Sequence, residues 1–335
     1  RHISWLCSIS LALEGRAGRG GLRRAVLPGM RVREPMDADI RRSGSFFMTR
    51  RQTLLAGLSA LAAACAPSLS TFDALTPKDG GARRVVRDAV CGPDPRQRLD
   101  LYAPTGTTPD ANLPVIVFAY GGSWASGEKN DYQFLGQALA ARGFVVAIPN
   151  YRLVPSAVFP AFIGDCARGV KWVADNVAAH GGDPTRIVLM GHSAGAYNAI
   201  MLALDQRYLR DAGVNASAIR GFAGLAGPYD FLPLDVDSTR NAFGAAADPQ
   251  ATQPIHFARA DGPPLLLLWG DRDTTVRQRS IIGMEHAASA AGQPVETKIY
   301  PRVDHVGIML ALSVPFRGNA PVLADVTEFA RRVTA

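Results

Sequence analysis

The sequence predicts an α/β fold with a mostly parallel central sheet and helices on both faces of that sheet. Two observations carry this prediction. Short apolar runs typical of buried strands alternate along the chain with segments whose apolar residues recur at helical spacing. Helical segments of about a dozen residues between strands are typical of right-handed crossovers, which join parallel strands. In such sheets, ligands bind at the carboxyl ends of the strands.

The elements are identified in order along the chain. Residues 84–89 and 97–102 flank a segment rich in turn residues, which predicts an antiparallel hairpin at the sheet edge. Residues 115–120 are apolar nearly throughout, as expected of a strand buried on both faces. Further strands are expected at 144–149, 187–190, 221–225, 265–269 and 296–300, and helices at 132–142, 162–180, 194–204, 277–291 and 322–332.

The chain of 335 residues has a formal net charge of +7, but this charge is not spread over the predicted fold. Residues 1–65 carry 11 Lys and Arg and 4 Asp and Glu, which leaves 25 of each sign in residues 66–335. The excess therefore lies outside the fold, and no basic patch with interleaved aromatic residues follows. We expect no nucleic-acid partner.

The first 65 residues divide into two parts. Residues 1–47 are rich in Arg and Gly and do not begin with methionine, so they are either translated upstream sequence or a disordered basic arm. Residues 48–65 resemble a secretory signal peptide, because Arg50 and Arg51 precede an apolar run. That run, of about a dozen residues, is too short to span a bilayer. We expect export to the periplasm.

The end of the signal allows two kinds of processing. The paired arginines resemble a twin-arginine signal, and residues 61–65 resemble a bacterial lipobox, in which Cys65 would be acylated after cleavage. Ala62 departs from the large aliphatic residue usual at that position, and plain cleavage near Ala66 is the alternative. The expected product is a membrane-anchored lipoprotein or an exported protein without an anchor.

Residues 66–82 are rich in Pro, Ser, Thr, Asp and Gly, which predicts a linker, and the folded domain is expected at 83–335. This domain contains Cys91 and Cys166, which could pair in an oxidising compartment or remain buried thiols. No spacing of His, Cys, Asp or Glu in it is typical of a metal site, and we expect neither a metal nor a cofactor.

The strand at 187–190 runs into the sequence Gly-His-Ser-Ala-Gly at 191–195, and a helical pattern begins immediately afterwards. This order predicts a sharp strand-to-helix turn that pushes the hydroxyl of Ser193 outward. Gly191 and Gly195 are expected there, because a Cβ at either position would collide where strand and helix approach each other. Gly-x-Ser-x-Gly is common by chance, so its structural context decides its meaning.

A serine hydroxyl is a poor nucleophile at neutral pH and needs an adjacent base that a carboxylate orients. His305 is the candidate base, because it is the histidine that follows the last expected strand, 296–300. His192 lies inside the turn and is expected to face away from Ser193. The other histidines lie in the leader, in helices or in an insert.

The orienting carboxylate is expected in the turn after strand 265–269. Asp273 is preferred over Asp271, because the residue directly after the strand-ending glycine is still in the turn, whereas the later aspartate can reach the histidine loop. Asp271 would then be a turn residue. Asp304, beside His305, is expected to be solvated.

Backbone amides that could stabilise a tetrahedral oxyanion are expected after strand 115–120. Gly121 and Gly122 lack side chains that would keep the backbone away from a substrate. We expect the amides of Gly122, Ser123 and Ala194 to form the oxyanion hole. A Gly-Gly turn alone would indicate only a hairpin, but the order of strand, glycine loop, serine turn, aspartate and histidine rarely arises by chance.

With these motifs, the chain resembles the α/β-hydrolase superfamily, and within it the carboxylesterase and hormone-sensitive-lipase-like branch, which includes small esterases and arylformamidases. The resemblance covers residues 84–332 and is specific for the fold and the triad but weak for the substrate. Tyr120 departs from it, because the family has a histidine there that braces the loop. The matching segments are 97–104, 121–124, 150–153, 181–184, 191–195 and 270–273.

The resemblance implies a serine hydrolase that cleaves small-molecule carboxylic esters through an acyl-enzyme, with Ser193 as nucleophile, His305 as base and Asp273 as the orienting carboxylate. An arylformamidase or another amide hydrolase is the alternative, since the same groups serve amides. A catalytically silent binding module on the same fold is a further alternative. The residues expected at the substrate pocket are Tyr120, Trp124 and His192.

Residues 229–264 form the longest insert from which a lid could come. Their large apolar residues are scattered: Phe231, Leu232, Phe243, Ile255 and Phe257. Each buried methylene contributes roughly 0.8 kcal/mol, but without a continuous apolar groove the methylenes of a long acyl chain beyond the first few stay in water and gain nothing. We therefore expect little or no lid and a preference for short acyl groups.

Overall fold

An eight-stranded sheet organises residues 68–335, the part of the chain that the computed structural model describes. The leader at 1–47, the signal at 48–65 and the lipidation site at Cys65 lie outside the described residues and remain predictions. The strands are β1 Ala82–Val90, β2 Arg98–Pro104, β3 Leu113–Ala119, β4 Val145–Pro149, β5 Gly182–His192, β6 Ile219–Leu225, β7 Leu265–Gly270 and β8 Val295–Tyr300.

The order across the sheet is β1-β2-β4-β3-β5-β6-β7-β8. From β4 to β8 all neighbours pair in parallel, whereas β1 pairs with β2, and β2 with β4, in the antiparallel sense. This confirms the mostly parallel sheet with an antiparallel N-terminal edge. Because β3 and β5 lie side by side near the middle, the loops that follow them meet at one end of the sheet.

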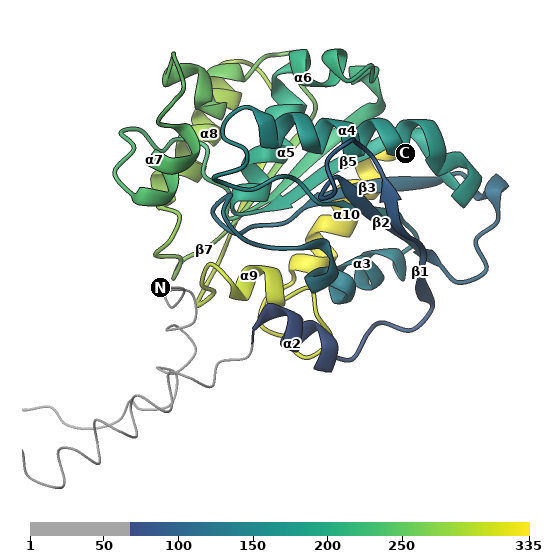
Figure 1. Cartoon of the computed structure of the whole chain (residues 1–335). Coiled ribbons are helices and arrows are strands. Elements are labelled where there is room, and N and C mark those ends of the chain that lie inside the picture. Colours follow the sequence, from purple (N-terminus) through teal and green to yellow (C-terminus); the bar gives the residue numbers. More distant parts are fainter. Residues whose placement is uncertain (1–67) are drawn as a thin grey trace, which may run out of the picture. The chain divides into compact units, whose positions relative to one another are not determined.

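Helices cover both faces of this sheet (Figure 1). In the view of Figure 1, α3 and α10 lie below the sheet, and α4, α5 and α8 lie above it. The α-helices of the described residues are α2 Leu69–Leu75, α3 Gln133–Ala140, α4 Ala161–Asn176, α5 Ala194–Leu204, α6 Gln206–Asp211, α7 Asp237–Phe243, α8 Gln278–Ala290, α9 Gly307–Leu310 and α10 Val322–Thr334.

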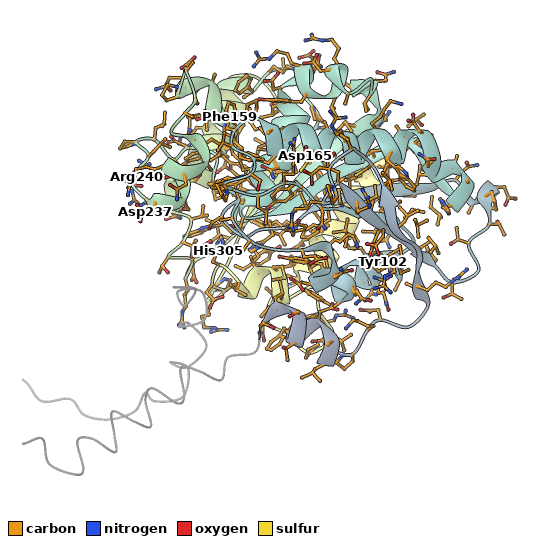
Figure 2. The ribbon with its side chains drawn as sticks, viewed as in Figure 1. Tyr102, Phe159, Asp165, Asp237, Arg240 and His305 are labelled. Atoms are coloured by element: carbon orange, nitrogen blue, oxygen red, sulfur yellow. The ribbon has the colours of Figure 1, made fainter. Side chains whose placement is uncertain are left out.

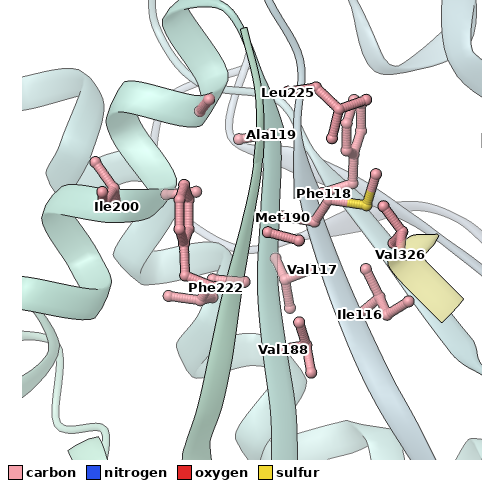
Figure 3. Close-up of a cluster of buried hydrophobic side chains, with 14 of the residues drawn as sticks. Ile116, Val117, Phe118, Ala119, Val188, Met190, Ile200, Phe222, Leu225 and Val326 are labelled. Carbon is pink, nitrogen blue, oxygen red and sulfur yellow. The ribbon is translucent and has the colours of Figure 1, made fainter. Parts of the chain in front are cut away.

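The two faces of the central strands pack against different helices (Figure 3). Phe118 of β3 and Met190 of β5 lie on the side of Val326 in α10, whereas Ile200 of α5 lies across the sheet. All four of these side chains are fully buried. Strands apolar on both faces are therefore explained by a helix layer on each side, as the sequence predicts.

The prediction of a linker at 66–82 is wrong from residue 68 onward. Helix α2 packs on the domain through Phe72, whose ring meets that of Phe134 edge to face at a centroid distance of 5.4 Å. Asp73, 2% exposed, accepts a hydrogen bond of 2.8 Å from the Phe134 amide at the start of α3. A helix of two turns depends on such tertiary contacts, and its polar composition does not reveal them.

The two cysteines of the domain, Cys91 and Cys166, are both free thiols. Burial raises the pKa of the Cys91 thiol to about 11, which keeps it protonated and unreactive at neutral pH. Among the helices of residues 68–335, none is both long enough and apolar enough to cross a bilayer.

Candidate active site

Ser193 occupies the sharp turn between β5 and α5. Its backbone angles, φ 54° and ψ −125°, lie in a region that residues with a side chain rarely adopt. The flanking glycines permit this turn. A Cβ on Gly191 would lie 2.4 Å from the carbonyl carbon of Gly195, and a Cβ on Gly195 would lie 2.1 Å from the carbonyl oxygen of Ala119.

Three side chains from three strand ends form a continuous chain of hydrogen bonds. Ser193 Oγ lies 2.8 Å from Nε2 of His305, and Nδ1 of His305 lies 2.7 Å from Oδ2 of Asp273. A carboxylate only accepts, so Nδ1 carries the proton, which leaves Nε2 to accept from the serine hydroxyl. The three residues are 4–8% exposed. This arrangement can raise the nucleophilicity of a serine oxygen.

Asp273 is held in its orientation by the backbone that follows it. Its second oxygen, Oδ1, accepts hydrogen bonds from the amides of Thr275 at 2.8 Å and Val276 at 2.9 Å. Asp271 instead accepts from the amide of Arg302 at 2.6 Å. The structure thus places Asp273 against the histidine and leaves Asp271 in a turn, as the sequence suggests.

Asp304 is not simply solvated, although it was expected to be. Its Oδ1 accepts a hydrogen bond of 2.7 Å from the amide of Gly307, the first residue of α9. The carboxylate therefore satisfies a backbone donor that the first turn of the helix leaves without an intrahelical partner.

The glycine loop after β3 lies against the serine turn. A Cβ on Gly121 would lie 2.9 Å from Cβ of Ser193, and Gly122 has φ 132°. Ser123 and Trp124 also have positive φ values, 52° and 57°. Positive φ values are strained for residues with a side chain, so the loop holds Ser123 and Trp124 in unusual backbone conformations. Ser123 and Ala194 line the same cavity as Ser193.

Tyr120 lies beneath this loop and is not among the residues that line the cavity, contrary to expectation. Its hydroxyl donates to Oδ1 of Asn150 at 2.8 Å and accepts from Nη2 of Arg96 at 3.0 Å. Arg96 also donates to the carbonyl oxygen of Gly127, at the end of the loop. The ring stacks on that of Tyr151 at a centroid distance of 4.8 Å. This tyrosine therefore braces the loop from below.

His192 is not among the residues that line the cavity, contrary to its assignment to the substrate pocket, but it faces away from Ser193, as expected. The side chain is buried, and its Nε2 lies 2.8 Å from the backbone oxygen of His305. Neighbouring residues at this turn point to opposite sides of the backbone, so the position of His192 next to Ser193 in sequence does not place its side chain in the pocket.

The cavity in front of Ser193 has a volume of about 200 Å³. Trp124 lines it as expected, together with Phe231 and Val236 of the insert. His305 lies near the same end of the sheet as Asp237 and Arg240 of α7 (Figure 2). The other lining residues are mostly polar: Ser123, Ser193, Ala194, Pro228, Asp230, Asp235, Ser238, Thr239, Thr274, Thr275, Val276, Arg277, Arg279 and Ser280.

The insert is fixed to the site by aromatic packing. Phe243 of α7, 2% exposed, meets the ring of Trp124 edge to face at 4.7 Å and that of Tyr197 at 5.1 Å. Phe231 packs on Phe243 at 5.1 Å. Phe243 of the insert therefore packs in the interior, whereas Phe231, Val236 and several polar residues of the insert line the cavity.

Sequence reasoning missed the charged wall residues Asp230, Asp235, Arg277 and Arg279. Arg277 ends the loop that carries Asp273, and Arg279 lies in the first turn of α8, so their position after β7 was a usable signal. Asp230 likewise follows β6, whereas Asp235 lies deeper in the insert, where no such signal exists. Among residues 68–335, no group of His, Cys, Asp and Glu could hold a metal ion.

The chain is similar to several proteins named as esterases. The family model BD-FAE matches residues 99–282. The chain is 31% identical to isoprenylcysteine alpha-carbonyl methylesterase ICME of Arabidopsis thaliana, over 73% of this chain and 61% of that protein. It is 27% identical to Esterase LipQ of Mycobacterium tuberculosis, over 71% of this chain and 61% of that protein. It thus spans less than two thirds of the length of these relatives.

One solved structure, an inhibited Esterase B from Lactobacillus rhamnosis, has a similar fold. The TM-score is 0.69 at 20% sequence identity, and the alignment covers 84% of this chain and 96% of that one. At this level of identity the similarity concerns the fold alone.

Proposed function

Because the chain belongs to the BD-FAE family, within the carboxylesterase branch of the α/β-hydrolase superfamily, we propose that it hydrolyses carboxylic esters of small molecules. The observation that carries this proposal is the unbroken hydrogen-bond chain from Asp273 through His305 to Ser193. Of these three residues, Ser193 lines the cavity.

In the proposed reaction, Ser193 Oγ attacks the acyl carbon while Nε2 of His305 takes the hydroxyl proton. The amides of Gly122, Ser123 and Ala194 stabilise the oxyanion of the tetrahedral intermediate. His305 then returns the proton to the leaving alcohol, and an acyl-enzyme remains on Ser193. Water repeats the sequence and releases the acid. Asp273 holds the imidazole in the required tautomer throughout.

The test of this mechanism is a burst experiment. With p-nitrophenyl butyrate, the wild type is expected to release one equivalent of p-nitrophenol per active site before the steady state, if deacylation is slower than acylation. A fluorophosphonate probe is expected to label the wild type on Ser193 and to leave Ser193→Ala unlabelled. An unlabelled wild type would favour the silent binding module.

We also propose that the ester has a short acyl group. The support is the small volume of the cavity, about 200 Å³, which limits how many methylenes of a long chain can be buried there. Values of kcat/KM for p-nitrophenyl acetate, butyrate, octanoate and palmitate decide this, and a maximum at octanoate or beyond would contradict it. A parallel series of anilides and an aryl formamide tests the alternative of an amide hydrolase.

We further propose that the protein is exported and that Cys65 carries a lipid. The support is sequence alone, namely the paired arginines Arg50 and Arg51, the apolar run and the lipobox-like end. Two acyl chains on Cys65 would suffice for stable membrane anchoring. Mass spectrometry of the mature N-terminus tests this proposal. An unmodified terminus at or after Ala66 would replace the lipoprotein with an exported protein that has no anchor.

A further inference from the structure

His192 lies behind the triad, and no step of the proposed reaction uses it. Its side chain is buried, with the residue 4% exposed. Nε2 lies 2.8 Å from the backbone oxygen of His305, and the two imidazole rings are 4.9 Å apart between their centroids. The ring thus contacts the base of the triad through both its main chain and its side chain.

The hydrogen bond determines which nitrogen of His192 carries the proton. A carbonyl oxygen only accepts, so Nε2 is protonated and Nδ1 is not. Burial, and after it the neighbouring His305, lowers the pKa of His192 to about 3. The ring is therefore a neutral donor at neutral pH. It adds no positive charge beside His305 when that residue takes up the serine proton.

The other nitrogen of His192 faces the glycine loop. Nδ1 is buried and has no hydrogen-bond partner among the described residues. A Cβ on Gly121 would lie 2.9 Å from it, so the loop backbone packs directly against the ring. The imidazole of His192 therefore lies between Gly121, directly before the proposed oxyanion hole, and the loop that carries His305.

We propose that His192 is a positioning residue that holds the main chain of His305 in register with Ser193 and the glycine loop. The inference rests on the proposed function, because it concerns the geometry of the same triad. Loss of the bond to the His305 carbonyl would let that residue shift, and a displacement of about 1 Å at such a site can lower the rate about a hundredfold.

Three variants test the role. His192→Phe keeps a planar ring but removes the donor, and His192→Gln restores an N–H group at a similar distance from the main chain. His286→Phe is the matched control, since His286 is exposed on α8. We expect His192→Phe to lower kcat about ten- to a hundredfold, with KM nearly unchanged. His192→Gln should recover most of this loss, and His286→Phe should match the wild type. Rates are expressed per site titrated with fluorophosphonate.

A spectroscopic measurement separates positioning from a general loss of structure. The proton on Nδ1 of His305, bonded to Asp273, is expected to give a downfield resonance in the proton NMR spectrum. His192→Phe should shift or broaden this resonance, and His192→Gln should retain it. Either an unchanged kcat per titrated site or an unmoved resonance in His192→Phe would overturn the proposal.

Two further arrangements keep the test decisive. If His192→Phe does not fold, His192→Asn replaces it. The side chain of asparagine is one methylene shorter than that of glutamine, so its amide cannot reach the backbone oxygen of His305 in the same way. Equal kcat values in His192→Asn and His192→Gln would overturn the proposal. The resonance is recorded without substrate. A wild type that cleaves no ester and takes up no probe would therefore refute the proposed function and leave the positioning test intact.

Discussion

The polar groups behind Ser193 and those in front of it differ in their pairing partners and in their exposure to water. Behind the serine, His192 is 4% exposed and donates to the backbone oxygen of His305. Asn150 is 5% exposed and accepts from the hydroxyl of Tyr120, which lies beneath the glycine loop. In front, the side chains of Asp235 and Arg277 form an ion pair of 2.8 Å but are 43% and 63% exposed.

This difference indicates a division of labour. Buried groups that hydrogen bonds hold in place have few arrangements available, so they can hold a triad within a few tenths of an ångström. Groups in contact with water are screened and can rearrange, so they can accept different substrates. Substitutions behind the serine are therefore expected to change rates and stability, whereas those in front are expected to change selectivity.

The largest effect is expected within the triad itself. Ser193→Ala and His305→Ala should each lower kcat by about 10⁴- to 10⁶-fold, because the triad acts as one unit. Neither change opens a large core cavity, so the midpoint of thermal unfolding should stay close to that of the wild type. Steady-state kinetics and calorimetry on the same preparations measure both quantities. A loss of less than about a hundredfold would contradict the triad assignment.

A pair of isosteric changes tests the carboxylate. Asp273→Asn should lower kcat about 10⁴-fold, because the amide no longer fixes the imidazole tautomer. Asp271→Asn is the control, since Asp271 accepts only from the amide of Arg302, and it should stay within a few-fold of the wild type. The reverse order of these two losses would move the triad carboxylate to Asp271.

The next largest effect is expected at Tyr120, which lies beneath the glycine loop. Tyr120→Phe keeps the stacked ring but removes the hydroxyl that pairs with Asn150 and Arg96. Each of the two lost hydrogen bonds contributes about 0.5–1.5 kcal/mol, so the free energy of unfolding in urea should fall by about 1–3 kcal/mol. Tyr208→Phe, on α6 away from the loop, serves as control. Equal stability of the two variants would show that the hydroxyl does not brace the loop.

Acid should destabilise the protein through His192. Its pKa is about 3 when folded and 6.5 in the reference state, so only the unfolded chain takes up a proton between these values. Stability is therefore lost as pH falls from 6.5 toward 3, at up to about 1.4 kcal/mol per pH unit. Urea unfolding at pH 7 and pH 5 should show about 2 kcal/mol less pH dependence in His192→Gln than in the wild type. An equal change in the free energy of unfolding between pH 7 and pH 5 in the two proteins would contradict this expectation.

The smallest effect is expected at the ion pair in front of the serine. Exposed pairs contribute about 0–1 kcal/mol, so Asp235→Asn should barely change the free energy of unfolding. On neutral esters, kcat/KM should change less than about threefold. On esters with a negatively charged substituent it should rise, because Arg277 loses its partner. Identical selectivity for charged and neutral esters would show that this wall does not contact substrates.

The mostly parallel sheet with its antiparallel edge and the contacts of Ser193, Asp273 and His305 could be predicted because the signals are local. The serine turn has a short sequence pattern, and the other two residues directly follow strands. Tyr120 and His192 were misplaced, since proximity in sequence to the site does not reveal on which side of the backbone a side chain lies. The cavity wall depends on how residues far apart in sequence meet, and no pattern within the insert shows that Phe243 packs on Trp124.

Helix α2 changes where the folded unit must be cut for expression. A boundary at Arg83, where the sequence predicts the domain to begin, would remove the ring of Phe72 from those of Phe134 and Phe316. It would also remove Asp79, whose carboxylate pairs with Arg142 and Arg317. A shortened protein that begins at Ser68 keeps these contacts, and any affinity tag or cleavage site belongs before that residue.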